Sequence, residues 1–319
     1  MRAYLIIILL LAVSLSGCKT KKSNPQLNEN HSQMEIKSTL YQSTNFTGNV
    51  RELQTSEVIP FAKVVLTDEK GKYFGSITDE AGNFSIKNLP LGVYRMRISA
   101  IGYRDVENIF DIKRHTNYQL EVKLSVFVNQ VEKPVIYLYP TQKQNIHVKL
   151  NYAGTLTHSY PKYTENGWNV TAEPNGTLWN ENGLEYYALF WEGKPTEPII
   201  PKDGFVVSGK ETAAFLEEKL CYLGLNRREA NEFIMYWLPR MENNPYNLIH
   251  FAGKQYEEQA TLEITPKPET IIRVMMVTQP LNSTITFPSQ DLTKLHMRRK
   301  GFTVVEWGGS AIPKLVPHL

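Results

Sequence analysis

The chain has 319 residues, of which 42% are hydrophobic and 21% charged, and its formal net charge is +3. This composition is typical of packed globular domains, and the length suffices for two domains of ordinary size. Because the positive and negative charges nearly balance, no basic field exists for nucleic acid, and we expect no nucleic-acid partner.

Residues 1–17 have the layout of a secretory signal. Arg2 supplies a positive start, residues 4–13 are almost entirely apolar, and small or modest residues follow. The apolar run is too short for a membrane-spanning helix, which needs roughly 20 residues. We therefore predict that residues 1–17 are a signal peptide.

The tetrapeptide Leu15-Ser16-Gly17-Cys18 comes directly after the apolar run and resembles the bacterial lipobox. The resemblance implies cleavage before Cys18 and acylation of its thiol, which would anchor the protein in a membrane. The alternative is a cleaved signal followed by a free cysteine. Cys221 is the other cysteine of the chain, so an acylated Cys18 leaves no internal disulfide.

Two features near Cys18 bear on localisation. Lys19 stands where an aspartate would resemble an inner-membrane retention signal, and the acidic run that resembles a surface-export signal is missing. We expect an outer-membrane lipoprotein, with the periplasmic leaflet favoured over the cell surface. Residues 18–44 are polar and lack a sustained period, so we predict the lipidated cysteine and a flexible tether there.

Residues 45–127 contain short runs of alternating hydrophobicity. Ala62, Val64 and Leu66 alternate, as do Phe84 and Ile86, and turn clusters rich in Asp, Asn and Gly separate the runs. This spacing is typical of a β-sandwich whose last strand covers residues 118–125. Residues 78–83 carry oxygen ligands of the kind that Ca²⁺ takes, but we interpret them as a solvated hairpin turn.

The order of the stretches FTGNV, IPFAKVVL, TDEAGNFSI, LPLGVY and ISAIGY resembles the carboxypeptidase regulatory-like domain. The resemblance covers about residues 45–126. It implies a seven-stranded, transthyretin-like sandwich without catalytic residues of its own, a domain common in exported proteins of Bacteroidetes.

Residues 131–312 form a second predicted unit, and residues 313–319 a tail. Strands are predicted at residues 135–140, 146–152, 168–174, 185–191, 260–266, 271–277 and 301–307. Two helices with apolar stripes lie between them. Ser208 and Asn226, each followed three residues later by Glu, predict capping boxes, while Gly224 and Pro239 predict the two helix ends.

The expected fold class is thus an all-β sandwich domain followed by an α+β domain with a largely antiparallel sheet and a helical hairpin. The stretches KPVIYLYP, YYALFWEG and GFTVVEWGG of the second unit resemble a widespread bacterial domain family of unknown function. That resemblance transfers no activity and no catalytic residue.

No catalytic motif with local spacing is present in the sequence, and the scattered histidines predict no metal site. Two Trp–Glu neighbours remain: Trp191 with Glu192, and Glu306 with Trp307. An indole beside a carboxylate suits a sugar, because the ring can stack on the pyranose while the carboxylate accepts hydroxyls. Arg273 lies in an apolar strand and must find an acidic partner if it points inward.

Three interpretations of these residues stay open. The tryptophans are core residues and each Glu pairs with Arg273 or a lysine; or the five residues line a cleft for a glycan or peptide; or Glu192 and Glu306 act as acid and base on a glycosidic bond. We expect a membrane-anchored envelope lipoprotein that acts as a non-enzymatic binding or interaction module for an envelope glycan, peptide or protein, without cofactor or metal. The alternatives are a glycan hydrolase and a purely structural spacer.

Overall fold

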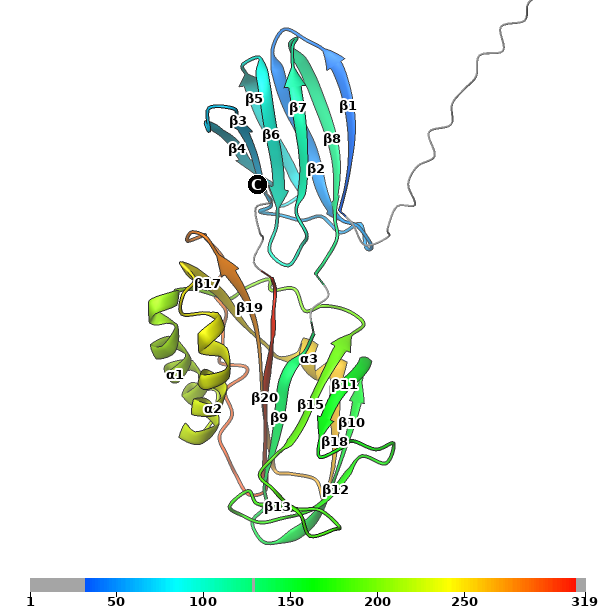
Figure 1. Ribbon diagram of the computed structural model, residues 1–319, viewed down its shortest axis with the longest axis vertical. Helices are drawn as coiled ribbons and strands as arrows, with labels where there is room; N and C mark the ends of the chain where they lie inside the picture. The colour runs from blue at the N-terminus through cyan, green and yellow to red at the C-terminus, as the bar shows by residue number, and fades with distance from the viewer. Residues whose placement is uncertain (1–31, 128–129, 314–319) are drawn as a thin grey trace, which may run out of the picture.

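The computed structural model describes residues 32–127 and 130–313. The predicted signal peptide, Cys18 and nearly all of the predicted tail lie outside the described residues. The described chain forms two units arranged end to end (Figure 1).

The first unit is a sandwich of two four-stranded sheets, with strand orders β1-β8-β2-β5 and β4-β3-β6-β7. Strand β8 lies between β1, to which it is antiparallel, and β2, to which it is parallel. The strands are β1 (Gln33–Leu40), β2 (Thr44–Glu52), β3 (Lys63–Asp68), β4 (Tyr73–Ile77), β5 (Asn83–Leu89), β6 (Gly92–Ser99), β7 (Val106–Ile112) and β8 (Thr116–Leu124).

The alternating residues fill the space between these two sheets, as the sequence predicts. Val64 and Leu66 on β3, Ile86 on β5, and Met96 and Ile98 on β6 are all buried in one core. Successive side chains of a strand point to opposite faces, so each alternating run buries one face and exposes the other. The predicted β-sandwich is confirmed.

Strand β1 corrects the predicted tether of residues 18–44. It pairs with β8 along its whole length, from Gln33 opposite Lys123 to Leu40 opposite Thr116. It is an edge strand and is largely exposed, so its sequence carries no buried alternating face by which to recognise it. The sandwich has eight strands, where the family resemblance implies seven.

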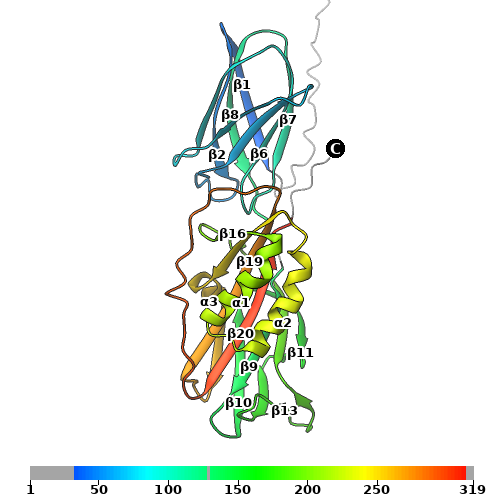
Figure 2. The same cartoon turned by 90° about the vertical axis from the view of Figure 1, so that its left-hand side faces the viewer.

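The second unit has three layers. A seven-stranded sheet of order β11-β15-β9-β20-β19-β17-β16 lies between a helical layer and a five-stranded sheet of order β14-β13-β12-β10-β18. Figure 2 shows helices α1 and α2 lying over one face of the larger sheet. The elements are β9 (Glu132–Tyr139), β10 (Gln144–Tyr152), β11 (Gly154–Tyr160), β12 (Trp168–Ala172), β13 (Leu178–Trp179), β14 (Glu185–Tyr186), β15 (Leu189–Pro195), β16 (Phe205–Ser208), η1 (Gly209–Glu211), α1 (Thr212–Tyr222), α2 (Arg227–Trp237), η2 (Leu238–Arg240), β17 (Tyr246–Ala252), α3 (Lys254–Gln259), β18 (Ala260–Thr265), β19 (Thr270–Leu281) and β20 (Thr303–Ala311).

The α+β class with a helical hairpin is confirmed, and in the described residues β19 with β20 is the one parallel pair of the larger sheet. The sequence did not predict the second sheet. The expected strands at 146–152, 168–174 and 260–266 form it as a separate layer, because alternation reveals a buried face but not the sheet to which a strand belongs.

The two predicted capping boxes differ in outcome. Asn226 accepts a hydrogen bond from the backbone N–H of Glu229 and Glu229 accepts one from that of Asn226, which confirms the box of α2. The buried Glu229 also accepts from the hydroxyl of Tyr139 at 2.7 Å, which ties α2 to β9. The box predicted at Ser208 is wrong: the turn η1 precedes α1, and the Ser208 hydroxyl donates to the Glu211 carboxylate instead.

The helix ends agree with their sequence signals. Gly224 follows α1 with φ of +101° and α2 ends directly before the short turn that contains Pro239.

The two units meet at the turn after β6. The backbone N–H of Gly102 donates to Gln279 Oε1 at 3.2 Å, and Ile200 of the second unit packs against the core of the sandwich. Ser32 bonds to the carbonyl of Arg104 beside this turn, and the N–H of Ile312 donates to Thr278. Both ends of the described chain therefore lie at the junction of the two units (Figure 1).

We predict that Gly102→Ala weakens the sandwich more than Gly71→Ala does. Both glycines have positive φ, +83° and +80°, so each alanine costs about 1 kcal/mol of backbone strain. A Cβ at Gly102 would also lie 3.0 Å from Ile200, whereas nothing lies within 4 Å at Gly71. Overpacking should add about 1 kcal/mol at Gly102, seen by calorimetry as the larger fall in Tm. Equal falls would mean that the Ile200 contact contributes no stability.

Candidate functional site

Three of the predicted site residues form a buried cluster between the two sheets of the second unit. Glu306 on β20 is 1% exposed and lies directly opposite Arg273 of β19. Its Oε2 lies 2.7 Å from Arg273 Nε and 2.6 Å from Nη2, and its Oε1 accepts from Trp191 Nε1 at 3.0 Å. The expectation that an inward Arg273 pairs with a glutamate is confirmed.

Aromatic rings close this cluster from the other layer. The guanidinium of Arg273 lies 4.6 Å from the ring centre of Tyr256, and the ring of Tyr152 packs edge-on against Trp191. Burial, and then the negative charge of Glu306, raise the pKa of the Tyr256 hydroxyl well above its ordinary value. Burial alone would lower the pKa of Arg273, but Glu306 more than offsets this and the pKa is raised. Both carboxylate oxygens of Glu306 therefore have internal partners.

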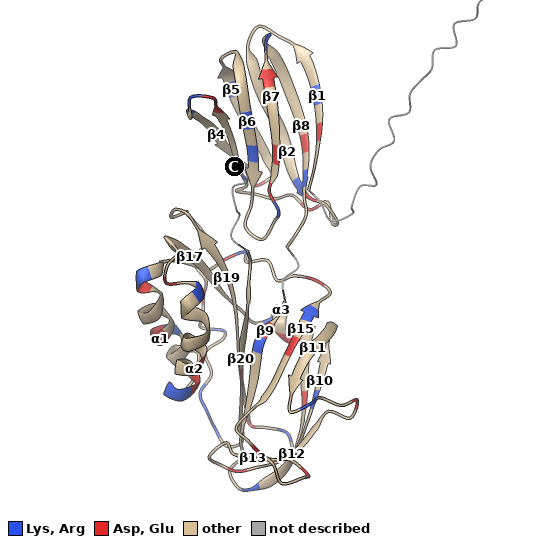
Figure 3. Cartoon of the chain, in the orientation of Figure 1, with Lys and Arg blue, Asp and Glu red and all other residues tan. Residues whose placement is uncertain are grey.

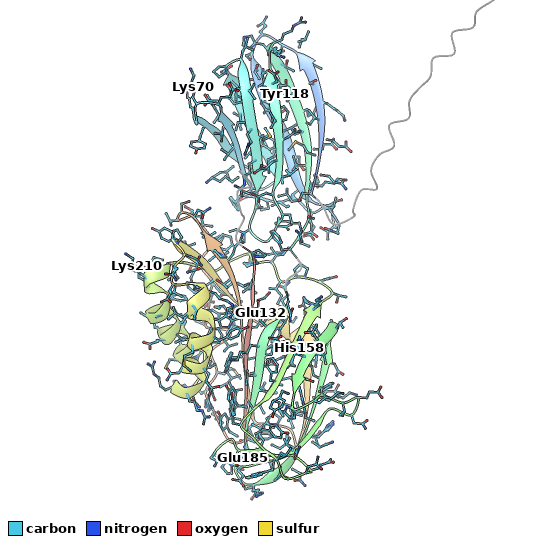
Figure 4. All side chains as sticks on the ribbon, viewed as in Figure 1. Lys70, Tyr118, Glu132, His158, Glu185 and Lys210 are labelled. Atoms are coloured by element: carbon cyan, nitrogen blue, oxygen red, sulfur yellow. The ribbon has the colours of Figure 1, made fainter. Side chains whose placement is uncertain are left out.

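Trp307 and Glu192 point to the opposite face of the same sheet. Trp307 is fully buried in the core under the helices, where its ring packs against Phe233. Glu192, with 20% of its side chain exposed, accepts from Gln130 Nε2 and from the backbone N–H of Lys133, both at 3.3 Å. Glu192 also lies 3.4 Å from His158, which Figure 4 labels on the outer strand β11.

The predicted cleft of Trp191, Glu192, Arg273, Glu306 and Trp307 is therefore wrong. Neighbouring residues of a strand point to opposite faces, so each Trp–Glu pair is split between two layers of the unit. Glu192 and Glu306 lie on opposite faces of one sheet and cannot flank a common glycosidic bond.

We predict that Glu306→Gln lowers the unfolding free energy of the second unit by about 3–5 kcal/mol, since it leaves Arg273 as an uncompensated buried charge. The double variant Arg273→Met/Glu306→Leu should recover most of that loss, because it removes both charges. Glu192→Gln, the matched control at a partly exposed carboxylate, should cost less than about 1 kcal/mol. Urea unfolding followed by tryptophan fluorescence measures this, because all five tryptophans lie in residues 168–307. A Glu306→Gln effect as small as that of Glu192→Gln would contradict the structural role.

His250 and Asp79 also have structural partners. His250 Nδ1 lies 3.0 Å from both the carbonyl and the carboxylate of Asp203, as a hydrogen-bonded core histidine would. Asp79 accepts from the backbone N–H groups of Ala81 and Asn83, so it closes a hairpin turn. Cys221 is exposed on α1, contrary to the usual burial of a free cysteine. The described residues contain no cluster of metal-binding side chains, and no helix among them is long and apolar enough to cross a membrane.

An open depression of about 540 Å³ lies on the sandwich instead. It lies at the end of the β1-β8-β2-β5 sheet away from the second unit. Asn117 and Gln119 face outward there, while Tyr118, labelled in Figure 4, faces the core and stacks on Phe46. The lining consists of amides, hydroxyls, two lysines and two tyrosines: Asn45, Asn88, Asn117, Gln119, Ser38, Thr39, Ser43, Thr47, Lys37, Lys87, Tyr41 and Tyr118.

The amide of Asn45 organises this depression. Its Nδ2 donates to Asn117 Oδ1 at 2.8 Å and to Ser43 Oγ at 3.1 Å, and its Oδ1 accepts from the backbone N–H of Asn88 at 3.0 Å. These bonds join β2 to β8 and to the end of β5. Asn117 takes part in the bond with Asn45 through Oδ1, so its amide hydrogens are not used in it.

The lining carries positive charge. None of the described residues that line the depression is acidic, and neither Lys37 nor Lys87 forms an ion pair with another described residue. Closer to the junction, the next outward residues on β1 and β8 are Glu35 and Glu121, which lie opposite each other and are both acidic. The depression thus offers amide and ammonium donors, hydroxyls and the half-exposed ring of Tyr41. This set suits a neutral or anionic ligand that is rich in hydroxyl groups.

Five of the lining residues lie in the predicted tether of residues 18–44, and the other seven lie on predicted sandwich strands and turns without a recognisable motif. One signal was available: Lys37 and Thr39, and then Asn45 and Thr47, are polar residues two apart that flank a short turn. Outward amides and hydroxyls on adjacent strands indicate a polar sheet face, but the pairing of β1 with β8 is needed to bring them together.

The comparisons with known proteins agree with this description of the first unit. Residues 46–136 match the family model of the CarboxypepD_reg-like domain. The match supports the carboxypeptidase regulatory-like assignment of the sandwich; it starts within β2 and leaves out β1. No curated protein matches the sequence.

Partial similarities to solved structures are weak. The streptococcal ancillary pilin is 16% identical over 50% of this chain and 57% of its own, with a TM-score of 0.24. The major pilin subunit BcpA of Bacillus cereus is 12% identical over 54% of this chain and 71% of its own, with a TM-score of 0.25. A cohesin–X-dockerin complex from Acetivibrio cellulolyticus is 18% identical over 25% of this chain, with a TM-score of 0.20. The chain spans about half the length of the cohesin–dockerin and ancillary pilin chains that it matches.

Proposed function

We propose that this protein is a lipid-anchored envelope protein that binds a hydroxyl-rich, neutral or anionic ligand of the glycan type in the depression of its sandwich domain. The observation that carries the proposal is the composition of the lining: four side-chain amides, four Ser or Thr hydroxyls and two lysines, with no carboxylate. Amides and hydroxyls both donate and accept, so they can pair with the vicinal hydroxyls of a sugar.

The volume of the depression is compatible with this role. About 540 Å³ lies within the range of roughly 300–1,000 Å³ that small-ligand sites occupy. Its polar lining favours a ligand that brings its own hydroxyls, because each lining group gives up water on binding and must be paired again. Tyr41, which is 59% exposed, supplies a ring face for stacking.

The membrane anchor of the proposal rests on the sequence around Cys18, which lies outside the described residues. Acylation of that cysteine would hold the protein at the outer membrane, and the lack of an acidic export run favours the periplasmic leaflet. The second unit, with its closed cores, would act as a stable body joined to the binding domain. A hydrolase that uses Glu192 and Glu306 is not proposed, since these carboxylates occupy opposite faces of a sheet.

We predict that the mature protein binds soluble polysaccharide or peptidoglycan fragments, and that Gln119→Ala and Lys87→Ala each weaken binding roughly fivefold, as the loss of about 1 kcal/mol implies. Both side chains are exposed, so neither change should alter folding. Isothermal calorimetry measures the affinity, with muropeptides, lipopolysaccharide-derived polysaccharide and dextran as probes.

Lys63→Ala is the matched control, because Lys63 is an exposed lysine on β3 in the other sheet. It should leave the affinity unchanged. If all four proteins bind a probe equally, the depression is not the site. If no probe binds at millimolar concentration, the proposal fails and the structural spacer becomes the better interpretation.

A further inference from the structure

Three apolar side chains protrude into solvent at the end of the sandwich farthest from the second unit. Leu40 is 71% exposed, Tyr41 59% and Leu91 50%. Leu40 and Tyr41 lie at the connection from β1 to β2, and Leu91 lies in the turn from β5 to β6.

Three turns bring these residues together with basic ones. The N–H of Tyr41 donates to the carbonyl of His115 in the β7–β8 turn. Strand pairing sets Thr44 beside Leu89 and Gly92 beside Ile112, so the turns at 41–43, 90–91 and 113–115 form one surface. We call this surface the tip.

The tip is basic. Its turn at 113–115 reads Lys-Arg-His, and none of its three turns contains an acidic residue. Lys113 pairs with Asp111 at 2.9 Å, which leaves Arg114 together with Lys37 and Lys87 of the adjoining depression as unpaired positive charges among the described residues. Figure 3 shows this positive charge at the far end of the sandwich. Exposed apolar residues among basic ones are the features by which peripheral proteins meet an anionic bilayer.

The length of chain before the described residues permits contact between the tip and the membrane. Ser32 lies at the junction of the two units, at the opposite end of the sandwich from the tip. Residues 19–31, fully extended, span roughly 45 Å at about 3.4 Å per residue. A nine-residue strand such as β8 is about 30 Å long. A lipid on Cys18 can therefore lie level with the tip.

We propose that the tip rests against the anionic leaflet that holds the acylated Cys18, with Leu40, Tyr41 and Leu91 in the headgroup region. This orientation places the depression beside the membrane surface, so that its ligand is met at the level of the lipid headgroups. The inference rests on the lipid anchor of the proposed function, but not on the identity of the ligand.

The experiment uses the mature acylated protein with Cys221→Ser, carrying one new cysteine labelled with an environment-sensitive fluorophore. Leu91→Cys places the label at the tip. Ile77→Cys is the matched control: Ile77 is 62% exposed on the same domain, and its pairing with Lys63, opposite Ser99, sets it at the junction end. Each protein is reconstituted into phosphatidylethanolamine vesicles with and without phosphatidylglycerol, and the emission maximum and iodide quenching are recorded.

We expect the label at position 91 to shift to the blue and to resist iodide in the anionic vesicles, while the label at position 77 stays in water. The double change Lys113→Glu/Arg114→Glu should abolish the shift, since each basic residue lost weakens the attraction to the leaflet roughly fivefold. Calorimetry of each variant checks that the sandwich stays folded.

Three results would overturn the inference: equal behaviour of the two labels, a tip shift that is insensitive to phosphatidylglycerol, or a shift that appears without vesicles and grows with protein concentration. The last would mean that a second copy of the chain covers the tip. The intact mass of the same protein reports acylation of Cys18, so failure of the anchor is distinguished from failure of the orientation, and ligand affinity is measured separately.

Discussion

The buried ion pair between Arg273 and Glu306 constrains the second unit, because neither charge can be buried there without the other. It lies across the parallel strands β19 and β20, and Trp191 reaches the same carboxylate from β15, two strands away from β20. Tyr256 and Tyr152 pack on this cluster from the facing layer. The two buried charges fix the register of β19 against β20, because any other register would leave each charge unpaired in an apolar core. Both oxygens of the Glu306 carboxylate are therefore used by the fold itself.

The surface of the sandwich has no such internal constraint. Its core is apolar, while the outer face of the β1-β8-β2-β5 sheet carries amides and hydroxyls that need not be satisfied internally. Strand β1 supplies one side of that face, and its position at the edge makes the depression part of the domain rather than of the tether. The tip adjoins the depression, so one end of the molecule carries both the proposed ligand site and the proposed membrane contact. The body of the second unit lies at the other end (Figure 1).

Sequence reasoning succeeded where a local pattern has one structural meaning. Alternation identified the sandwich strands, Asn226 identified the cap of α2, and the apolar flanks of Arg273 required an acidic partner inside the fold. It failed where the role of a residue depends on which strands pair and which face of a sheet the side chain takes. Trp191 and Glu192 look like one site in the sequence, but neighbouring residues of a strand point to opposite faces of the sheet. Likewise β1 lacks a buried face, so only its pairing with β8 reveals it, and the depression depends on that pairing.

Hydrogen–deuterium exchange of the mature protein, with and without a bound soluble polysaccharide, distinguishes the depression from the second unit as the ligand site. We expect slower exchange in residues 37–47 and 117–119, around the depression, and unchanged exchange in β15, β19 and β20. Protection of β15 and β20 with an unchanged sandwich would show instead that the ligand binds near Trp191 and Glu306, and the depression would not be the site.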